Sequence, residues 1–200
     1  KIALSFPELV RRILAEGHEA QFHAWDHRRW QDEVLRKDEQ WIINWFEAGI
    51  NSFEKLVGKK PEAFGAPGWV IDERVLKILS EFNFKYLSCT RAIKPFIHQA
   101  NGLIEIPSDL PCFEEIGIEN GVSKIMSLLE NGGIHILPVH AEVEGGLWKE
   151  QFIELLEKII DAGYQIKTLA EIYNIVKTKQ LTTKNHEMTL LQGRAFPCAV

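Results

Sequence analysis

Helical and strand-like segments alternate along most of the 200-residue chain, and this alternation constrains its fold more than any other feature. Apolar residues at helical spacing, often closed by Gly, predict helices, and short apolar runs between turn residues predict strands. We expect helices over residues 6–16, 38–57, 72–82, 119–130, 148–162 and 169–176, and strands over 18–22, 85–88, 103–106, 134–139 and 164–167. Strands joined by helical crossovers run parallel, so the sequence predicts the α/β class.

The length suits one domain, expected over residues 1–176, with a C-terminal tail over 177–200 that shows no periodicity and should be loose. Apolar residues make up 46% of the chain and charged residues 26%, which is typical of a soluble globular protein. The net charge is 23 − 28 = −5 and no basic block occurs, which argues against nucleic acid as a partner. No apolar run reaches the roughly 18–20 residues of a spanning helix, so any membrane contact should be peripheral.

The cysteines indicate neither a disulfide framework nor a cysteine zinc site. Cys89, Cys112 and Cys198 are odd in number and contain no CxxC pair. A reducing compartment fits this usage, and we expect a cytoplasmic protein, with any membrane contact peripheral and on the cytoplasmic side.

Histidines follow two of the predicted strands, at the end where parallel strands present a common crevice. His23 and His27 are four residues apart, so on a helical turn they would share one face and could hold a divalent metal. The alternative is that the spacing arises by chance. His140 follows the strand over 134–139, and an imidazole at a strand end suits a general acid. Alternatively, it only hydrogen-bonds the backbone.

Four further residues are candidates for substrate binding. Trp69 ends a loop with two Gly and one Pro and could form the wall of a sugar site, or it could simply pack in the core. Arg91 follows the strand over 85–88 and could hold a phosphate with both arms of its guanidinium, or it could be an ordinary surface residue. Glu142 and Glu144, just after His140, complete the set.

Several short sequence words resemble the polysaccharide deacetylase (NodB-homology) family of metal-dependent N- and O-deacylases. They are His23-Ala24-Trp25-Asp26-His27, Pro67-Gly68-Trp69 and Leu137-Pro138-Val139-His140, and the resemblance covers roughly residues 5–175. It implies a distorted (β/α) barrel, His23 and His27 as ligands of a divalent metal such as Zn, Co or Mn, and His140 as the catalytic acid.

One branch of the family is especially similar, the deformylases of 4-deoxy-4-formamido-L-arabinose-phosphoundecaprenol in lipid A modification and polymyxin resistance. The similarity lies in the motif from His23 to His27 together with Trp30 and Gln31. It also lies in Ile106-Pro107, in Leu110-Pro111 and in the motif from His140 to Gly145. It implies metal-dependent hydrolysis of a formyl amide and a lipid-linked amino sugar as the partner. A deacetylase of N-acetylated glycans and a non-catalytic metal- or sugar-binding fragment are the alternatives, and the oligomeric state stays open.

The chain departs from the family pattern in two places. Members open with a strand that bears two acids, the catalytic base and a third metal ligand, whereas residues 1–17 match the helix after it. We therefore expect an N-terminally truncated barrel that lacks its first strand and is inactive alone. In addition, the loop over 64–69 lacks the usual arginine, and Cys89 or Thr90 stands where an acid often precedes Arg91.

Overall fold

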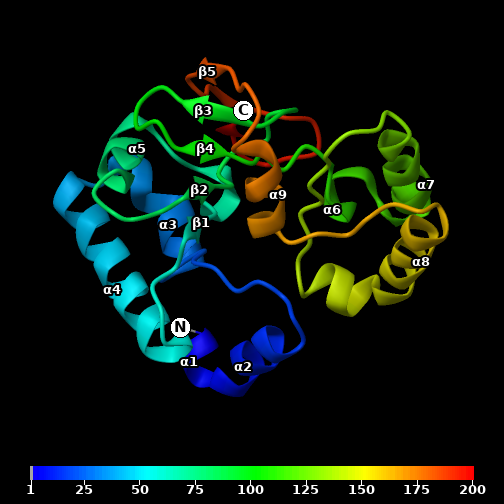
Figure 1. Ribbon diagram of the computed structural model, residues 1–200, viewed down its shortest axis with the longest axis horizontal. Coiled ribbons are helices and arrows are strands. Elements are labelled where there is room, and N and C mark those ends of the chain that lie inside the picture. Colours follow the sequence, from blue (N-terminus) through cyan, green and yellow to red (C-terminus); the bar gives the residue numbers. More distant parts are fainter. Residues whose placement is uncertain (1) are drawn as a thin grey trace.

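The computed structural model describes residues 2–200, with Lys1 outside the described part, and it alternates helices with short strands (Figure 1). The helices are α1 (Ile2–Ser5), α2 (Pro7–Ala15), α3 (His27–Glu33), α4 (Glu39–Val57), α5 (Glu73–Leu79), α6 (Phe113–Ile116), α7 (Ile118–Leu129), α8 (Lys149–Asp161) and α9 (Leu169–Val176). The strands are β1 (Ala63–Phe64), β2 (Tyr86–Leu87), β3 (Phe96–His98), β4 (Ile104–Glu105), β5 (Thr183–Lys184), β6 (Met188–Thr189) and β7 (Cys198–Ala199). Three short helical turns are not α-helical. The turns η1 (Val34–Arg36) and η2 (Pro67–Trp69) are 3₁₀ helix, and η3 (Val143–Leu147) is π helix.

A five-stranded sheet in the order β1-β2-β4-β3-β5 is the centre of the fold. The pairs β1–β2, β2–β4 and β3–β5 are parallel, and β3–β4 is antiparallel. Phe22 adds one parallel bridge to Phe64 at the β1 edge. The predicted α/β class with mostly parallel strands is therefore confirmed, and the described strands form an open sheet.

Helices cover both faces of this sheet because neighbouring strand residues point to opposite sides. Phe64 and Leu87 face the aromatic core formed with α3, α4 and α5. Ala63 and Tyr86 face α9 instead. A third apolar cluster holds α6, α7 and α8 together, to one side of the sheet in Figure 1.

Helix α4 shows how the local sequence sets these elements. Asp38 accepts a hydrogen bond from the Trp41 backbone N–H at 2.8 Å and so caps the first turn. Gly58 ends the helix in the left-handed conformation with φ of 82°. The predicted helix over 38–57 is thus confirmed, and the face that it buries carries Trp45 and Phe46.

Two predicted strands are wrong. Residues 134–139 run without a strand ladder, because the Asp109 side chain takes the Ile136 N–H at 2.6 Å and Pro138 has no N–H to donate. Residues 164–167 are largely exposed and pair with none of the strands in the described part of the chain. The strand expected over 18–22 is reduced to the bridge at Phe22.

The last twenty residues are more ordered than their sequence pattern predicts. Strand β5 extends the main sheet, and β7 pairs with β6 in a two-stranded ribbon. Cys198 and Ala199 are fully buried, and the Ala199 carbonyl accepts the Arg91 N–H at 2.8 Å. The expectation of a loose tail is therefore corrected. The sequence pattern missed these strands because a strand of two residues is too short to show apolar periodicity.

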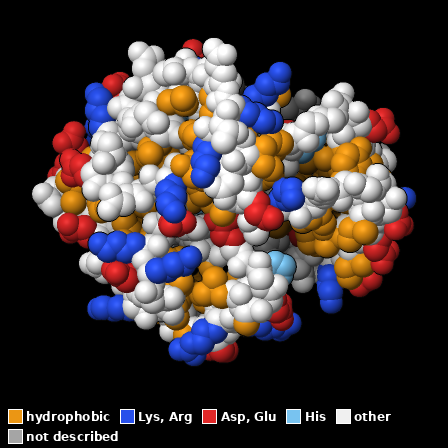
Figure 2. Space-filling model, in the orientation of Figure 1, with side chains coloured by type: hydrophobic (Ala, Val, Ile, Leu, Met, Phe, Trp, Pro, Cys, Tyr) orange, Lys and Arg blue, Asp and Glu red, His pale blue; other side chains and the backbone are white. Residues whose placement is uncertain are grey.

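Part of the surface is apolar. Figure 2 shows hydrophobic side chains over α1 and α2 and over the α7–α8 side, and the exposed fractions of Ile2 and Ile160 are 75% and 61%. Among residues 2–200, no helix is both long and apolar enough to cross a bilayer.

We expect Gly49→Ala to destabilise the fold. Gly49 lies inside α4 against the Phe22 ring, and an added Cβ would overlap that ring. Overpacking of a core costs about 1–3 kcal/mol, whereas alanine improves helix propensity by only about 1 kcal/mol. Urea unfolding should show a net loss of up to about 2 kcal/mol. Gly145→Ala, where the added Cβ meets open space, is the control; equal stability of the two variants would contradict the close contact.

Candidate functional site

Four of the residues predicted from the sequence line one cavity. His23, His27, His140 and Glu142 surround a space of about 830 Å³ next to α1 and α4. The first two come from the segment after Phe22 and the last two from the segment after 134–139. The cavity therefore joins residues more than a hundred positions apart in the chain.

His23 and His27 lie close together, but not on one helical turn as the spacing predicts. Their ring centroids are 5.0 Å apart. Asp26 caps α3 with an extended backbone, its side chain accepting the Arg29 N–H at 3.2 Å, so that the helix begins only at His27. His23 lies before the helix, so the loop that precedes α3, and not a helical turn, brings the two imidazole rings together. The helical prediction failed because Asp26 is a strong N-cap residue.

A backbone carbonyl fixes the tautomer of His23. Its Nδ1 lies 2.8 Å from the Gly65 oxygen, and a carbonyl can only accept, so Nδ1 carries the proton. In the neutral ring Nε2 then keeps its lone pair, as a metal-binding histidine requires. Burial against protein atoms lowers the pKa of both His23 and His27, which favours neutral rings.

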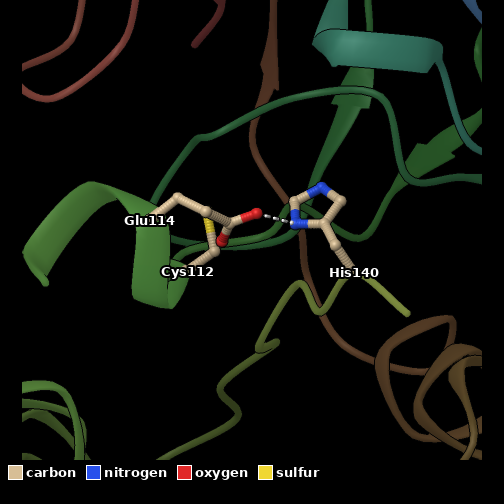
Figure 3. Close-up of side chains that lie close together, drawn as sticks. All are labelled: Cys112, Glu114 and His140. Atoms are coloured by element: carbon tan, nitrogen blue, oxygen red, sulfur yellow. Dashed lines mark ion pairs between the residues drawn. The ribbon is translucent and has the colours of Figure 1, made fainter. Parts of the chain in front are cut away.

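Glutamates hold the ring and the backbone of His140. Its Nδ1 lies 2.9 Å from Glu114 Oε1, an ion pair drawn in Figure 3. The buried Glu144 carboxylate accepts the His140 backbone N–H at 2.6 Å, which ties the histidine to the turn η3. Glu144 is therefore a structural support, while Glu142 is exposed at the cavity.

Cys112 and Glu114 were missed by the sequence reasoning. Together with His140 they form the one group of three possible metal ligands found within residues 2–200, with ligand atoms all within 4.8 Å of one another. No CxxC pair marks Cys112, and the pairing of residues 112–114 with residue 140 depends on tertiary structure. His23 and His27 thus gain no third Cys, Asp or Glu ligand from the described chain.

Trp69 and Arg91 lie outside this cavity. Trp69 is buried, with φ of 56°, and the Arg91 guanidinium lies 4.7 Å from its ring centroid. Arg91 also donates to the backbone carbonyls of Ser108 and Leu110. Its side chain is only 5% exposed, so this placement does not support the predicted role in phosphate binding.

A buried ion pair holds α6 beside the sheet. Glu115 accepts from Arg91 Nη1 at 2.6 Å and Nη2 at 3.0 Å, and from Arg194 at 3.2 Å. Burial alone would raise the pKa of Glu115, but the hydrogen bonds and charge of Arg91, with help from Arg194, outweigh it and hold the pKa below its ordinary value. This pair fixes the helix that carries Cys112 and Glu114.

Comparison with known proteins gives consistent similarities. Residues 1–87 match the family model described as polysaccharide deacetylase. A deformylase of 4-deoxy-4-formamido-L-arabinose-phosphoundecaprenol from Wigglesworthia glossinidia brevipalpis is 31% identical over 79% of this chain and 59% of its own. A peptidoglycan N-acetylglucosamine deacetylase from Bacillus cereus is 28% identical over 83% of this chain and 68% of its own.

Solved structures share the fold. A structure from Mycobacterium smegmatis assigned as a polysaccharide deacetylase matches with a TM-score of 0.77 at 20% identity, over 94% of this chain and 73% of its own. The chain spans less than three fifths of the length of the first two curated relatives, at 59% and 58%.

We expect Glu115→Gln to lower the free energy of unfolding by about 3 kcal/mol at neutral pH, because it leaves Arg91 buried without its partner charge. The folded pKa of Glu115 is below the ordinary 4.5, so its stabilisation is complete above that pH and is lost as pH falls through the folded value. Urea unfolding of wild type and variant should converge in acid. Glu119→Gln, on an exposed residue of α7, is the control; a constant difference between wild type and Glu115→Gln at all pH values would refute the pairing.

Proposed function

We propose that the chain carries active-site residues of a metal-dependent carbohydrate amide hydrolase, because residues 1–87 match the polysaccharide deacetylase family model and a relative named as a deformylase is 31% identical. One observation carries the proposal. His23, His27 and His140 line a single cavity, and the Gly65 carbonyl leaves Nε2 of His23 free to bind.

The donor set fits a divalent transition metal. Two neutral imidazoles 5.0 Å apart can bind one ion between them, and imidazole nitrogen suits Zn, Co and related metals better than Mg or Ca. A divalent ion held there would supply an activated water and polarise the amide carbonyl. The Nδ1–H hydrogen bond to Gly65 would keep His23 in the binding tautomer throughout.

His140 acts as the general acid in this proposal. With Nδ1 held by Glu114 at 2.9 Å, Nε2 is the ring atom available to give a proton to the leaving nitrogen. Glu144 holds the His140 backbone and Glu114 orients the ring, so both are positioning residues. The 830 Å³ cavity leaves room for a sugar.

We propose a formamido sugar linked through phosphate to a polyprenyl lipid as the substrate, at the cytoplasmic face of a membrane. Two relatives named as deformylases of such a lipid, 31% and 27% identical, support it. A pocket closed around the formyl hydrogen would exclude the methyl of an acetyl group by steric overlap. Deacetylation of N-acetylated glycans is the second candidate, supported by the Bacillus cereus relative.

We expect His23 and His27 to bind one equivalent of Ni²⁺ weakly, since two ligands hold a metal less firmly than the usual three or four. Isothermal calorimetry of the chain should show this equivalent, and the His23→Ala/His27→Ala variant should lose it. His18→Ala, at an exposed histidine, is the matched control. Unchanged stoichiometry in the double variant would remove the pair as a metal site.

The hydrolysis assay should use the protein in its longest natural form. We expect formate release from the formamido-arabinose phospholipid and little acetate release from N-acetylated glycan oligomers. His140→Gln should slow the reaction by about 10²–10⁴-fold with metal content retained, as for loss of one acid. Acetate release alone would favour the glycan deacetylase, and full activity of His140→Gln would reject His140 as the acid.

A further inference from the structure

We propose that Cys112, Glu114 and His140 form a second cation site, selective for zinc-like metals and distinct from the His23–His27 pair. Occupation of this site would take His140 out of proton transfer, so excess zinc would inhibit the enzyme. The inhibitory effect rests on the proposed function, whereas the binding site does not.

The three side chains already converge. Sulfur, carboxylate oxygen and imidazole nitrogen lie within 4.8 Å of one another, and Figure 3 shows the carboxylate directed at the imidazole with the Cys112 sulfur beside it. The thiol also hydrogen-bonds Glu114. Ligands of a tetrahedral zinc lie roughly 3.3–3.6 Å apart for bonds of about 2.0–2.3 Å. The widest separation, at most 4.8 Å, therefore has to close by no more than about 1.2–1.5 Å.

Of the three proposed metal ligands, one side chain is fixed by the fold and the other two can change conformation. Cys112 is buried at the N-cap of α6, a helix that the Arg91–Glu115 pair fixes in place. The Glu114 and His140 side chains are 38% and 42% exposed, so both can rotate. The small closure can come from these two side chains without movement of α6.

The chemistry of the cluster selects a soft divalent metal. Thiolate and imidazole together favour Zn²⁺ over Mg²⁺ and Ca²⁺. Without a cation the thiol stays protonated, because burial, followed by the charges of Glu115 and Glu114, raises the pKa of Cys112 to about 12. A bound metal would displace that proton and balance the negative charges, with water in the fourth position.

The inhibitory effect follows from the shared histidine. In the metal-free cluster the Glu114 carboxylate lies 2.9 Å from Nδ1 of His140. A metal bound to Nδ1 of His140 would displace a proton from this atom, and the Glu114 carboxylate would become a ligand of the metal. His140 would then be turned and held by the metal, and its Nε2 would no longer be presented to the leaving nitrogen.

Cobalt substitution tests the site directly, since a thiolate bound to Co²⁺ gives a charge-transfer band in the near ultraviolet. We expect the band in the wild-type chain and in His23→Ala/His27→Ala, and its loss in Cys112→Ser. Serine is a good N-cap residue, so this variant should keep α6. Cys198→Ser, at another buried cysteine, is the matched control and should keep the band.

Two further measurements complete the test. Glu114→Gln, at a more exposed residue, should weaken zinc binding by about ten- to a hundredfold even if Cys112→Ser fails to fold. Added zinc should slow formate release by wild type and not by Cys112→Ser. A band that persists in Cys112→Ser would overturn the site. Inhibition that persists there would overturn the inhibitory effect, and absence of formate release would reject the proposed function while leaving the cobalt result valid.

Discussion

The buried ion pair between Arg91 and Glu115 is the interaction on which the arrangement of the candidate site most depends. It joins the segment after β2 to α6, and Arg194 near the C-terminus adds a second cation to the same carboxylate. A lone buried charge is costly, so these three charged groups stabilise the fold only together. This pair holds Glu114 and Cys112 in position, because Glu114 lies on the same short helix as Glu115 and Cys112 is the N-cap residue of that helix.

The sequence was most informative where one short stretch decides the structure. Helix α4 is delimited by Asp38 and Gly58, which act on their own neighbours, and α9 begins after the capping residue Thr168. These boundaries need no knowledge of the rest of the chain. The α/β class follows in the same way from the order of such elements.

Prediction failed where the partner lies far along the chain. The segment over 134–139 has a strand-like composition, yet the Asp109 side chain takes its backbone N–H. Strand β7 is too short for a periodic signal, and its burial depends on contacts with the segment around Arg91. The histidines of the site could be identified from the spacing of His23 and His27 and from the apolar segments that precede them and His140. Cys112 and Glu114 become relevant only because α6 is folded against His140.

Asp26 stands between the two histidines and starts α3 after His23, which has a practical consequence for anyone who wishes to transplant the pair. In a continuous helix, a histidine pair four residues apart can be moved as a peptide, since the helix carries its own geometry. Here the ring of His23 is oriented by the carbonyl of Gly65, forty-two positions away. The smallest portable unit is therefore two discontinuous loops on a shared scaffold, and grafting residues 23–27 alone would transfer the two histidines without the contact that orients His23.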